Sequence, residues 1–284
     1  MPARNVALGL LAGVLLGVTL AMVRNATDRT VRDGEALAAS SGLPVLAQVP
    51  GPGAGGGASQ LVADESMRGL RTRLLGSEAT QPRSFLISAP GEDQDSSTTA
   101  YNLAHAFASV DEAVLLIEGD PRRPTIAELL GLRSPLGLAD VLADPQLLDE
   151  AVQPTSTPNL WMLAASEPSK ITRRADATLL ATTLEKMFAN FDRVVIDGPP
   201  SFVSADSGVL ATAVDATVLV VRSGVTTLDE VDGAVKNLRA AGGDIVGAVL
   251  TGARVPRRTV KAIVAYREKV GDAASTAAPA THAK

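Results

Sequence analysis

Between residues 84 and 267 the sequence alternates short, nearly continuous apolar runs with stretches of helical periodicity. Strands buried on both faces show such runs, and parallel strands need a long crossover, usually a helix, to connect them. The pattern therefore predicts an α/β fold, with a mostly parallel, doubly wound sheet and helices on both faces. The expected strands are 85–88, 114–118, 160–164, 193–197, 217–221 and 245–250. The expected helices are 97–110, 125–132, 175–189, 205–213, 228–241 and 256–267.

Composition narrows the kinds of site that the 284-residue chain can build. It has no cysteine and only two histidines, His105 and His282, which argues against thiol, zinc and histidine-based sites. A net charge of −5 and an aromatic content of 3% argue against nucleic acid as a partner. Nucleic-acid binding needs basic patches or aromatic stacking platforms, and this composition is poor in both.

Residues 6–23 form an uncharged stretch close to the ~20 residues that a membrane-spanning helix needs. Arg4 precedes the stretch, whereas Arg24, Arg29 and Arg32 follow it. This excess of arginine predicts a single-pass protein of the cell membrane, in contact with lipid, whose body lies in the cytoplasm. A cleaved signal peptide is the alternative interpretation.

The chain divides by composition into four expected parts. Residues 1–27 are the transmembrane anchor, and 28–59 are a juxtamembrane segment, with a helix over 28–41, that ends in a Gly/Pro-rich linker. Residues 60–270 form the α/β domain, with a further helix near its start. Residues 271–284 are rich in Ala, Thr and Pro and are expected to be a disordered tail.

Polar residues follow three of the expected strands. After the first comes a loop, residues 89–99, that feeds a helix, where backbone N–H groups and the helix dipole can bind phosphate. Glu118 and Asp120 follow the second strand, and Asp197 follows the fourth. Ligands bind beyond the carboxyl ends of parallel strands, so these carboxylates are expected to meet the hydroxyl of Ser97. Such oxygens suit Mg²⁺ on phosphates, although strand-end carboxylates also cap turns.

Several segments together carry a family resemblance: Pro90-Gly91-Glu92 with residues 97–104, residues 115–124, and residues 194–200. Their order resembles the cytoplasmic domain of bacterial tyrosine kinases of the capsule and exopolysaccharide type, a branch of the deviant-Walker P-loop ATPases. The N-terminal part resembles the second membrane helix and exit segment of chain-length-determinant proteins, the polysaccharide co-polymerases. The resemblance reaches about residue 253 and implies a P-loop NTPase-like sheet preceded by one N-terminal transmembrane helix.

The resemblance also implies ATP and Mg²⁺ as cofactors and assigns roles to residues. It implies catalytic roles for Glu118, Asp120 and Asp197, and metal ligation by Ser97, Glu118 and Asp197. It implies nucleotide contacts from Gly91, Ser96, Ser97, Thr98, Arg122 and Arg123. Glu65, Arg68 and Arg71 match the family's assembly motif, which implies a homo-oligomer, although this spacing is also typical of ion pairs on a helix surface. The implied partners are membrane proteins of polysaccharide assembly.

The sequence departs from the family pattern at the phosphate loop. Ser96 stands where the family has its phosphate-binding Lys, Asp95 replaces the Gly before it, and the loop is two residues longer. Losing a charge-assisted hydrogen bond costs on the order of 1.5–3 kcal/mol, which is about one to two orders of magnitude in affinity. The family's C-terminal tyrosine cluster is also absent, since only Tyr101 and Tyr266 occur.

Three functions follow from these observations. The leading hypothesis is a membrane-anchored regulator or scaffold of exopolysaccharide assembly, degenerate in nucleotide binding. The second is an active ATP-dependent tyrosine kinase in which an arginine replaces the missing lysine. The third is a membrane-associated ATPase similar to MinD and ParA.

The last expected helix has a basic side. Arg254, Arg257, Arg258, Lys261 and Lys269 fall on one side of it, opposite Val260, Ile263 and Val264. This pattern indicates either contact with anionic lipid or an ordinary solvated face.

Overall fold

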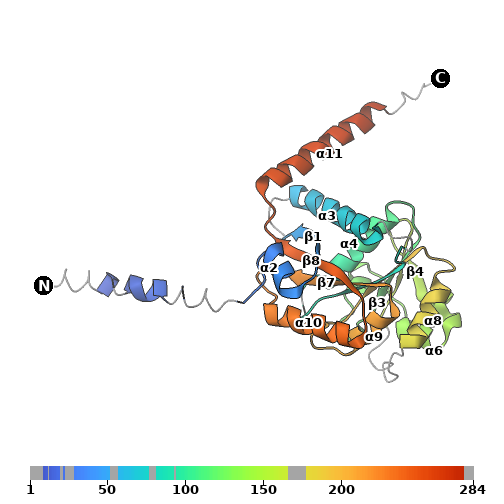
Figure 1. Ribbon diagram of the computed structural model, residues 1–284. Coiled ribbons are helices and arrows are strands. Elements are labelled where there is room, and N and C mark those ends of the chain that lie inside the picture. The colour runs from blue at the N-terminus through green and yellow to red at the C-terminus, as the bar shows by residue number, and fades with distance from the viewer. Residues whose placement is uncertain are drawn as a thin grey trace.

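The computed structural model describes residues 9–11, 13–19, 22, 29–51, 57–76, 81–92, 94–165 and 177–277. These residues form one eight-stranded sheet in the order β1-β8-β7-β2-β6-β3-β5-β4 (Figure 1). Neighbouring strands are parallel except for the antiparallel pair of β4 and β5. The expectation of a mostly parallel α/β sheet is thereby confirmed.

The bounds of the elements are as follows. The strands are β1 (Val45–Pro50), β2 (Ser84–Ser88), β3 (Val114–Glu118), β4 (Val152–Pro154), β5 (Leu160–Leu163), β6 (Arg193–Asp197), β7 (Ala216–Arg222) and β8 (Ile245–Ala253). The helices are α2 (Gly34–Ser41), α3 (Gly57–Leu75), α4 (Ser96–Ala108), α5 (Ile126–Leu129), α6 (Leu138–Ala143), η1 (Pro145–Leu147), α7 (Leu148–Ala151), α8 (Ala177–Met187), α9 (Asp206–Ala213), α10 (Leu228–Ala241) and α11 (Arg257–Ala277).

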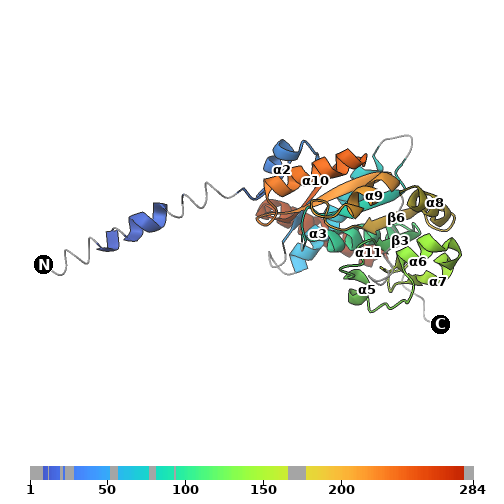
Figure 2. The ribbon, with the colours of Figure 1, turned by 90° about the horizontal axis from the view of Figure 1, so that it is seen from below.

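Helices cover both faces of the sheet, as the two ribbon views show (Figures 1 and 2). Alternate side chains of a strand point to opposite faces, so Phe85 and Ile87 of β2 pack with α3 and α4, whereas Leu86 packs with α9 and α10. All three side chains are fully buried. Burial on both faces explains why the central strands read as unbroken apolar runs.

The segment expected to be juxtamembrane belongs in large part to the domain itself. β1 pairs in parallel with β8 at the edge of the sheet, and α2 packs beside α10. Asp33 caps α2 by accepting a hydrogen bond from the N–H of Ala36 at 2.8 Å. The edge position explains how β1 tolerates Pro50, because an edge strand can lose ladder hydrogen bonds. The domain therefore begins earlier than the expected residue 60.

Four short elements were not expected from the sequence. β4, α6, η1 and α7 lie between Leu138 and Pro154 and are too short to show a period. At the other end, α11 continues to Ala277, beyond the point at which the disordered tail was expected to begin. Alanine is the best helix former, and the alanines among residues 273–277 favour this continuation.

The described part of the expected membrane stretch is helical over residues 9–11 and 13–19, with exposed apolar side chains that include Leu15 and Leu16. Within the residues that the structure describes, no helix meets the length and apolarity that membrane crossing requires. Much of the 6–23 stretch lies outside these residues.

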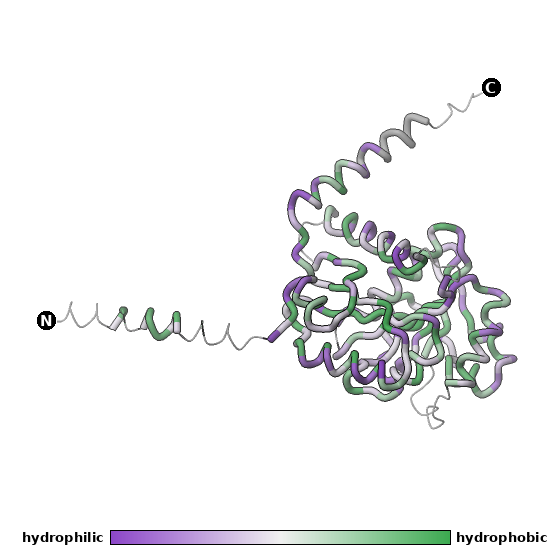
Figure 3. Tube along the Cα trace, viewed as in Figure 1, coloured by the Kyte–Doolittle hydropathy of each residue, from purple (hydrophilic) through white to green (hydrophobic). Residues whose placement is uncertain are grey.

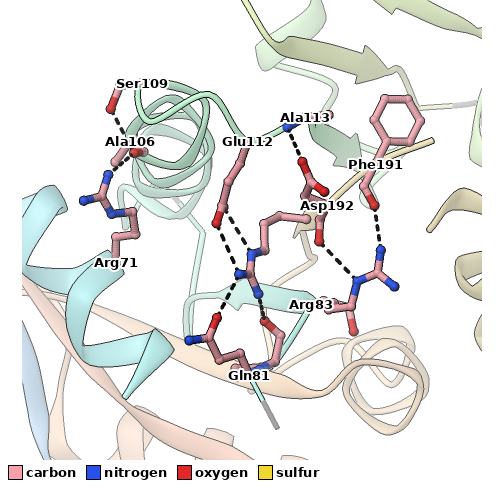
Figure 4. Close-up of polar contacts among 12 residues, drawn as sticks. Arg71, Gln81, Arg83, Ala106, Ser109, Glu112, Ala113, Phe191 and Asp192 are labelled. Atoms are coloured by element: carbon pink, nitrogen blue, oxygen red, sulfur yellow. Dashed lines mark hydrogen bonds and ion pairs between the residues drawn. The ribbon is translucent and has the colours of Figure 1, made fainter. Parts of the chain in front are cut away.

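A polar cluster fixes the amino edge of the sheet (Figure 4). Arg193, at the start of β6, is buried and donates through Nε and Nη2 to the carboxylate of Glu112 at 3.1 and 3.2 Å. It also donates to Oε1 of Gln81 at 3.2 Å. Bidentate arginine–carboxylate pairs of this kind fix geometry as well as energy. The candidate site lies at the opposite edge of the sheet, at the carboxyl ends of the parallel strands.

Candidate functional site

A cavity of about 300 Å³ lies at the carboxyl edge, where β2 runs through a loop into the N-terminus of α4. Its lining comes from the loop, from the ends of β6 and β7, and from the segment after β3. The lining residues include Gly91, Ser96, Ser97, Thr98, Asp120, Arg123, Asp197 and Arg222. The structure therefore brings most of the expected site residues together, with the exceptions of Glu118 and Arg122.

Asp95, the residue before α4, has left-handed backbone angles of φ 66° and ψ 16°. Glycine adopts these angles freely, whereas an L side chain pays a cost that Asp and Asn tolerate best. The Asp95 carboxylate accepts a 2.8 Å hydrogen bond from the hydroxyl of Thr251 and lies 3.4 Å from a guanidinium nitrogen of Arg222. A negative side chain is thus held beside the helix N-terminus, where a phosphate-binding loop would present backbone N–H groups.

Gln94 fills the interior of the loop. Its side chain is buried, and a Cβ added to Gly91 would lie only 2.6 Å from its Nε2 atom. Its Oε1 accepts a 2.8 Å hydrogen bond from Thr226, a fully buried residue after β7. The glycine at position 91 therefore makes room for a protein side chain in this structure.

The same β7–α10 connection contacts the segment that follows the expected anchor. Thr30 and Thr227 form an antiparallel bridge, and the N–H of Val31 donates to the carbonyl of Thr226 at 2.8 Å. The N–H of Gly224 donates in turn to the carbonyl of Val31 at 2.7 Å. Thr226 thus links the chain around Val31 to Gln94 in the loop.

Asp197, at the end of β6, is buried at 5% exposure, and its Oδ1 has no hydrogen-bond partner among the described residues. Burial raises its pKa from 3.8 to about 7. A hydrogen bond from Ser97 opposes this rise, whereas the charges of Glu118 and Asp120 add to it. A buried carboxylate with one oxygen unsatisfied and no cation beside it is costly, and it marks a place where a cation would be stabilised.

Glu118, for which the family resemblance implies a catalytic and metal-binding role, is engaged by backbone donors in this structure. It is the register partner of Asp197 across β3 and β6, and it is buried. Its Oε1, however, accepts from the N–H groups of Ile126 at 2.5 Å and Ala127 at 3.2 Å, at the start of α5. Glu118 lines a separate cavity with the residues that follow α5. Its carboxylate is committed to satisfying backbone donors.

The two arginines after β3 point to different carboxylates. Arg122 pairs with Asp206 at 2.9 Å and also lies 4.0 Å from Asp120 of the cavity lining, although it does not line the cavity itself. Arg123 lines the cavity and pairs with Glu92 at 2.9 Å.

Sequence reasoning missed Arg222, Gln94, Thr226 and the carboxylate contact of Thr251. The available signal was the position of Arg222, a basic residue that directly ends a buried strand.

The three residues of the expected assembly motif do not share one environment. Glu65 lies 3.6 Å from Arg267 of α11 in the same chain. Arg71 donates to the carbonyl of Ala106 at the end of α4 at 2.8 Å. Arg68 alone of the three is exposed. Two of the three side chains therefore already have contacts within the chain.

The site fits a magnesium ion better than it fits a triphosphate. The hydroxyl of Ser97 and the unpaired oxygen of Asp197 are hard donors suited to Mg²⁺. Within the described residues, no three acidic or histidine side chains gather closely enough to hold a metal. An ion would therefore depend on water or ligand oxygens. The cavity is lined by four carboxyl groups and two arginines, and the excess of acidic groups opposes a triphosphate. The acidic residues are Glu92, Asp95, Asp120 and Asp197, and the arginines are Arg123 and Arg222.

A parallel sheet whose β2–α4 loop feeds a helix N-terminus, with carboxylates on neighbouring strand ends, defines a P-loop NTPase-like protein. The solved structure of the BceF tyrosine kinase domain superposes with a TM-score of 0.68 at 25% identity, covering 79% of this chain and 100% of that one.

The relatives in sequence are bacterial tyrosine-protein kinases. YwqD of Bacillus subtilis is 29% identical over 197 residues, which cover 69% of this chain and 83% of YwqD. Ptk of Acinetobacter johnsonii is 25% identical over 262 residues, 86% of this chain. The matched region spans only 36% of Ptk. No protein-family model matches the chain.

Proposed function

We propose that this chain is a membrane-anchored regulatory or scaffolding protein of exopolysaccharide or capsule biosynthesis. Its tyrosine-kinase-like domain holds Mg-ATP weakly or not at all. The kinase relatives support the domain type, and the resemblance to chain-length-determinant proteins supports the setting. The exposed apolar side chains of the N-terminal stretch support the anchor.

The observation that carries the proposal is the position of Asp95. Its carboxylate lies at the mouth of the phosphate loop and is paired with Arg222 and Thr251. Arg222 is therefore engaged by an internal anion at the place where a phosphate would need a cation. Neighbouring Ser96 offers a neutral hydroxyl in place of the family's lysine.

A regulatory role is supported by the contacts around Thr226. They connect the segment that follows the anchor to the loop of the cavity through Val31 and Gln94. A change at the membrane would reach the cavity by this route, whether or not nucleotide is turned over. The implied partners are membrane proteins of polysaccharide assembly and further copies of this chain.

The test is calorimetric titration of Mg-ATP and Mg-ADP into the full-length chain and into a double variant, Asp95→Gly with Ser96→Lys. We expect the double variant to bind about ten- to a hundredfold more tightly, because it regains a charge-assisted hydrogen bond and loses a repulsive carboxylate. A melting curve of each protein controls for folding.

The alternative function is an active tyrosine kinase, and the two arginines that line the cavity, Arg123 and Arg222, favour it. Micromolar binding by the unmodified chain, with phosphotyrosine that disappears in Asp120→Ala, would establish this alternative and contradict the proposal. Absence of binding by both proteins would instead mean that the longer loop, rather than the missing lysine, prevents nucleotide binding.

A further inference from the structure

The start of α11 carries a cluster of exposed positive charge, which we call the basic face: Arg254, Arg257, Arg258 and Lys261. The first turn of α11 contains no acidic residue. Within the described part of the chain, none of the four side chains has an ion pair or hydrogen bond. Figure 3 shows the hydrophilic colour of this segment. The cluster stands out because the whole chain carries a net charge of −5.

The basic face is held in a fixed direction. Val260, Ile263 and Val264 of α11 are half-buried, and α11 lies against α3. Arg257 is three residues before Val260 and seven before Val264, so the basic face borders this apolar side rather than lying opposite it. Arg267 of α11 pairs with Glu65 of α3 at 3.6 Å. These contacts fix the position of α11, and the four basic residues remain exposed.

The basic face lies at the same edge of the sheet as the segment leading to the expected anchor. β8 ends at Ala253 and α11 begins at Arg257, so the face follows the carboxyl end of a parallel strand. The segment around Val31 is hydrogen-bonded to the connection after β7, which leaves the same carboxyl edge. In both ribbon views, α2 and the start of α11 lie at one end of the domain (Figures 1 and 2).

We propose that the basic face binds the anionic headgroups of a lipid bilayer and so turns the carboxyl edge of the domain toward the membrane. This inference rests on the membrane anchor in the proposed function, which brings the domain to the surface. Each basic residue near an anionic leaflet raises affinity about fivefold, within a Debye length of about 10 Å. The cavity between β2 and α4 then faces the membrane, where partner proteins of the membrane would meet it.

The experiment uses the full-length chain with a fluorophore on Thr259→Cys, which gives a single site because the chain has no cysteine. Flotation with vesicles of neutral phosphatidylcholine, or with added phosphatidylglycerol, reports membrane association. Quenching by spin-labelled lipid reports how closely the label approaches the bilayer. The test variant is Arg257→Gln with Arg258→Gln. The matched control is Lys186→Gln with Arg239→Gln, which removes two exposed charges from the last turns of α8 and α10.

We expect the chain to float with both vesicle types, and quenching to rise severalfold with the anionic lipid. That rise should disappear in the test variant and persist in the control. Flotation with both vesicle types but equal quenching would overturn the basic-face proposal and leave the anchor intact. Flotation with anionic vesicles alone would overturn the anchor and support the basic face. Failure to float with either vesicle type would overturn both.

Discussion

The carboxylate of Asp95 lies 3.4 Å from the guanidinium of Arg222, across the mouth of the loop between β2 and α4. The two residues are far apart in the sequence, and the pairing of β2 with β7 brings them together. Asp95 keeps the left-handed backbone that a glycine would supply at this position. The loop therefore retains a glycine-like backbone turn while it carries a negative side chain.

The first prediction concerns the effect of the left-handed backbone at Asp95 on the stability of the domain. Asp95→Ala should lower the free energy of unfolding by about 1–2 kcal/mol, because alanine loses the contacts with Thr251 and Arg222 and keeps the unfavourable angles. Asp95→Gly should change the free energy of unfolding by about 0.5 kcal/mol or less. Glycine adopts the left-handed angles without strain, and this gain offsets the loss of a partly exposed ion pair. Urea unfolding of both variants, with Ser96→Ala as the control, measures the difference. Equal losses in the two variants would contradict the backbone argument.

The second prediction concerns the pH dependence of stability. Burial raises the pKa of Asp197 to about 7 in the folded protein, whereas the unfolded chain has a value near 3.8. Between pH 4 and pH 7 the folded state therefore retains a proton that the unfolded state has lost. The contribution of Asp197 to stability is complete below pH 4 and is lost as the pH rises to about 7, by at most about 4 kcal/mol.

Unfolding measured from pH 4 to pH 8 in the presence of EDTA tests this dependence. Asp197→Asn should be less sensitive to pH than the unmodified chain, because the neutral amide has no proton to lose. A difference between the two proteins that stays constant across this range would show that Asp197 titrates normally.

The third prediction separates a structural role of Glu118 from a catalytic one. Glu118→Gln should lower the free energy of unfolding by about 1–3 kcal/mol, because a neutral amide accepts more weakly than a carboxylate from the N–H groups of Ile126 and Ala127. Its NH2 group would also face the N–H of Ala165, which donates to Oε2 of Glu118 at 3.4 Å. Amide hydrogen exchange in α5 should accelerate. Glu128→Gln, at an exposed position of α5, is the control and should change stability by less than about 0.5 kcal/mol. An unchanged stability in Glu118→Gln would return Glu118 to the list of candidate ligands.

The fourth prediction concerns assembly through α3. Because Glu65 and Arg71 have contacts within the chain, exposed Arg68 is the member of the motif available to a second copy. Arg68→Glu should shift the sedimentation coefficient toward that of the 29.1 kDa monomer. Arg239→Glu on α10 is the matched control. Sedimentation that does not change in Arg68→Glu would exclude the motif as an assembly contact.

Much of the fold could be predicted from local sequence. The six expected strands are present, with ends shifted by at most three residues, and α10 has the expected bounds. These elements are fixed by apolar runs and helical periodicity, which act over a few neighbouring residues. β1 and β4 were not expected as strands of the sheet, because each is held by pairing with another strand, β8 or β5, rather than by a pattern of its own.

The candidate site, like the fold, could be predicted only in part from the sequence. The sequence by itself determined that a loop follows β2, that Ser96 stands in place of a lysine, and that Asp197 ends a buried strand. Tertiary structure alone decided that Arg222 and Thr251 engage Asp95, that Gln94 fills the loop, and that Glu118 faces α5. The order of residues shows which chemical groups follow each strand. The direction of a side chain and the choice of its partner depend on strand order and packing, which join residues far apart in the chain.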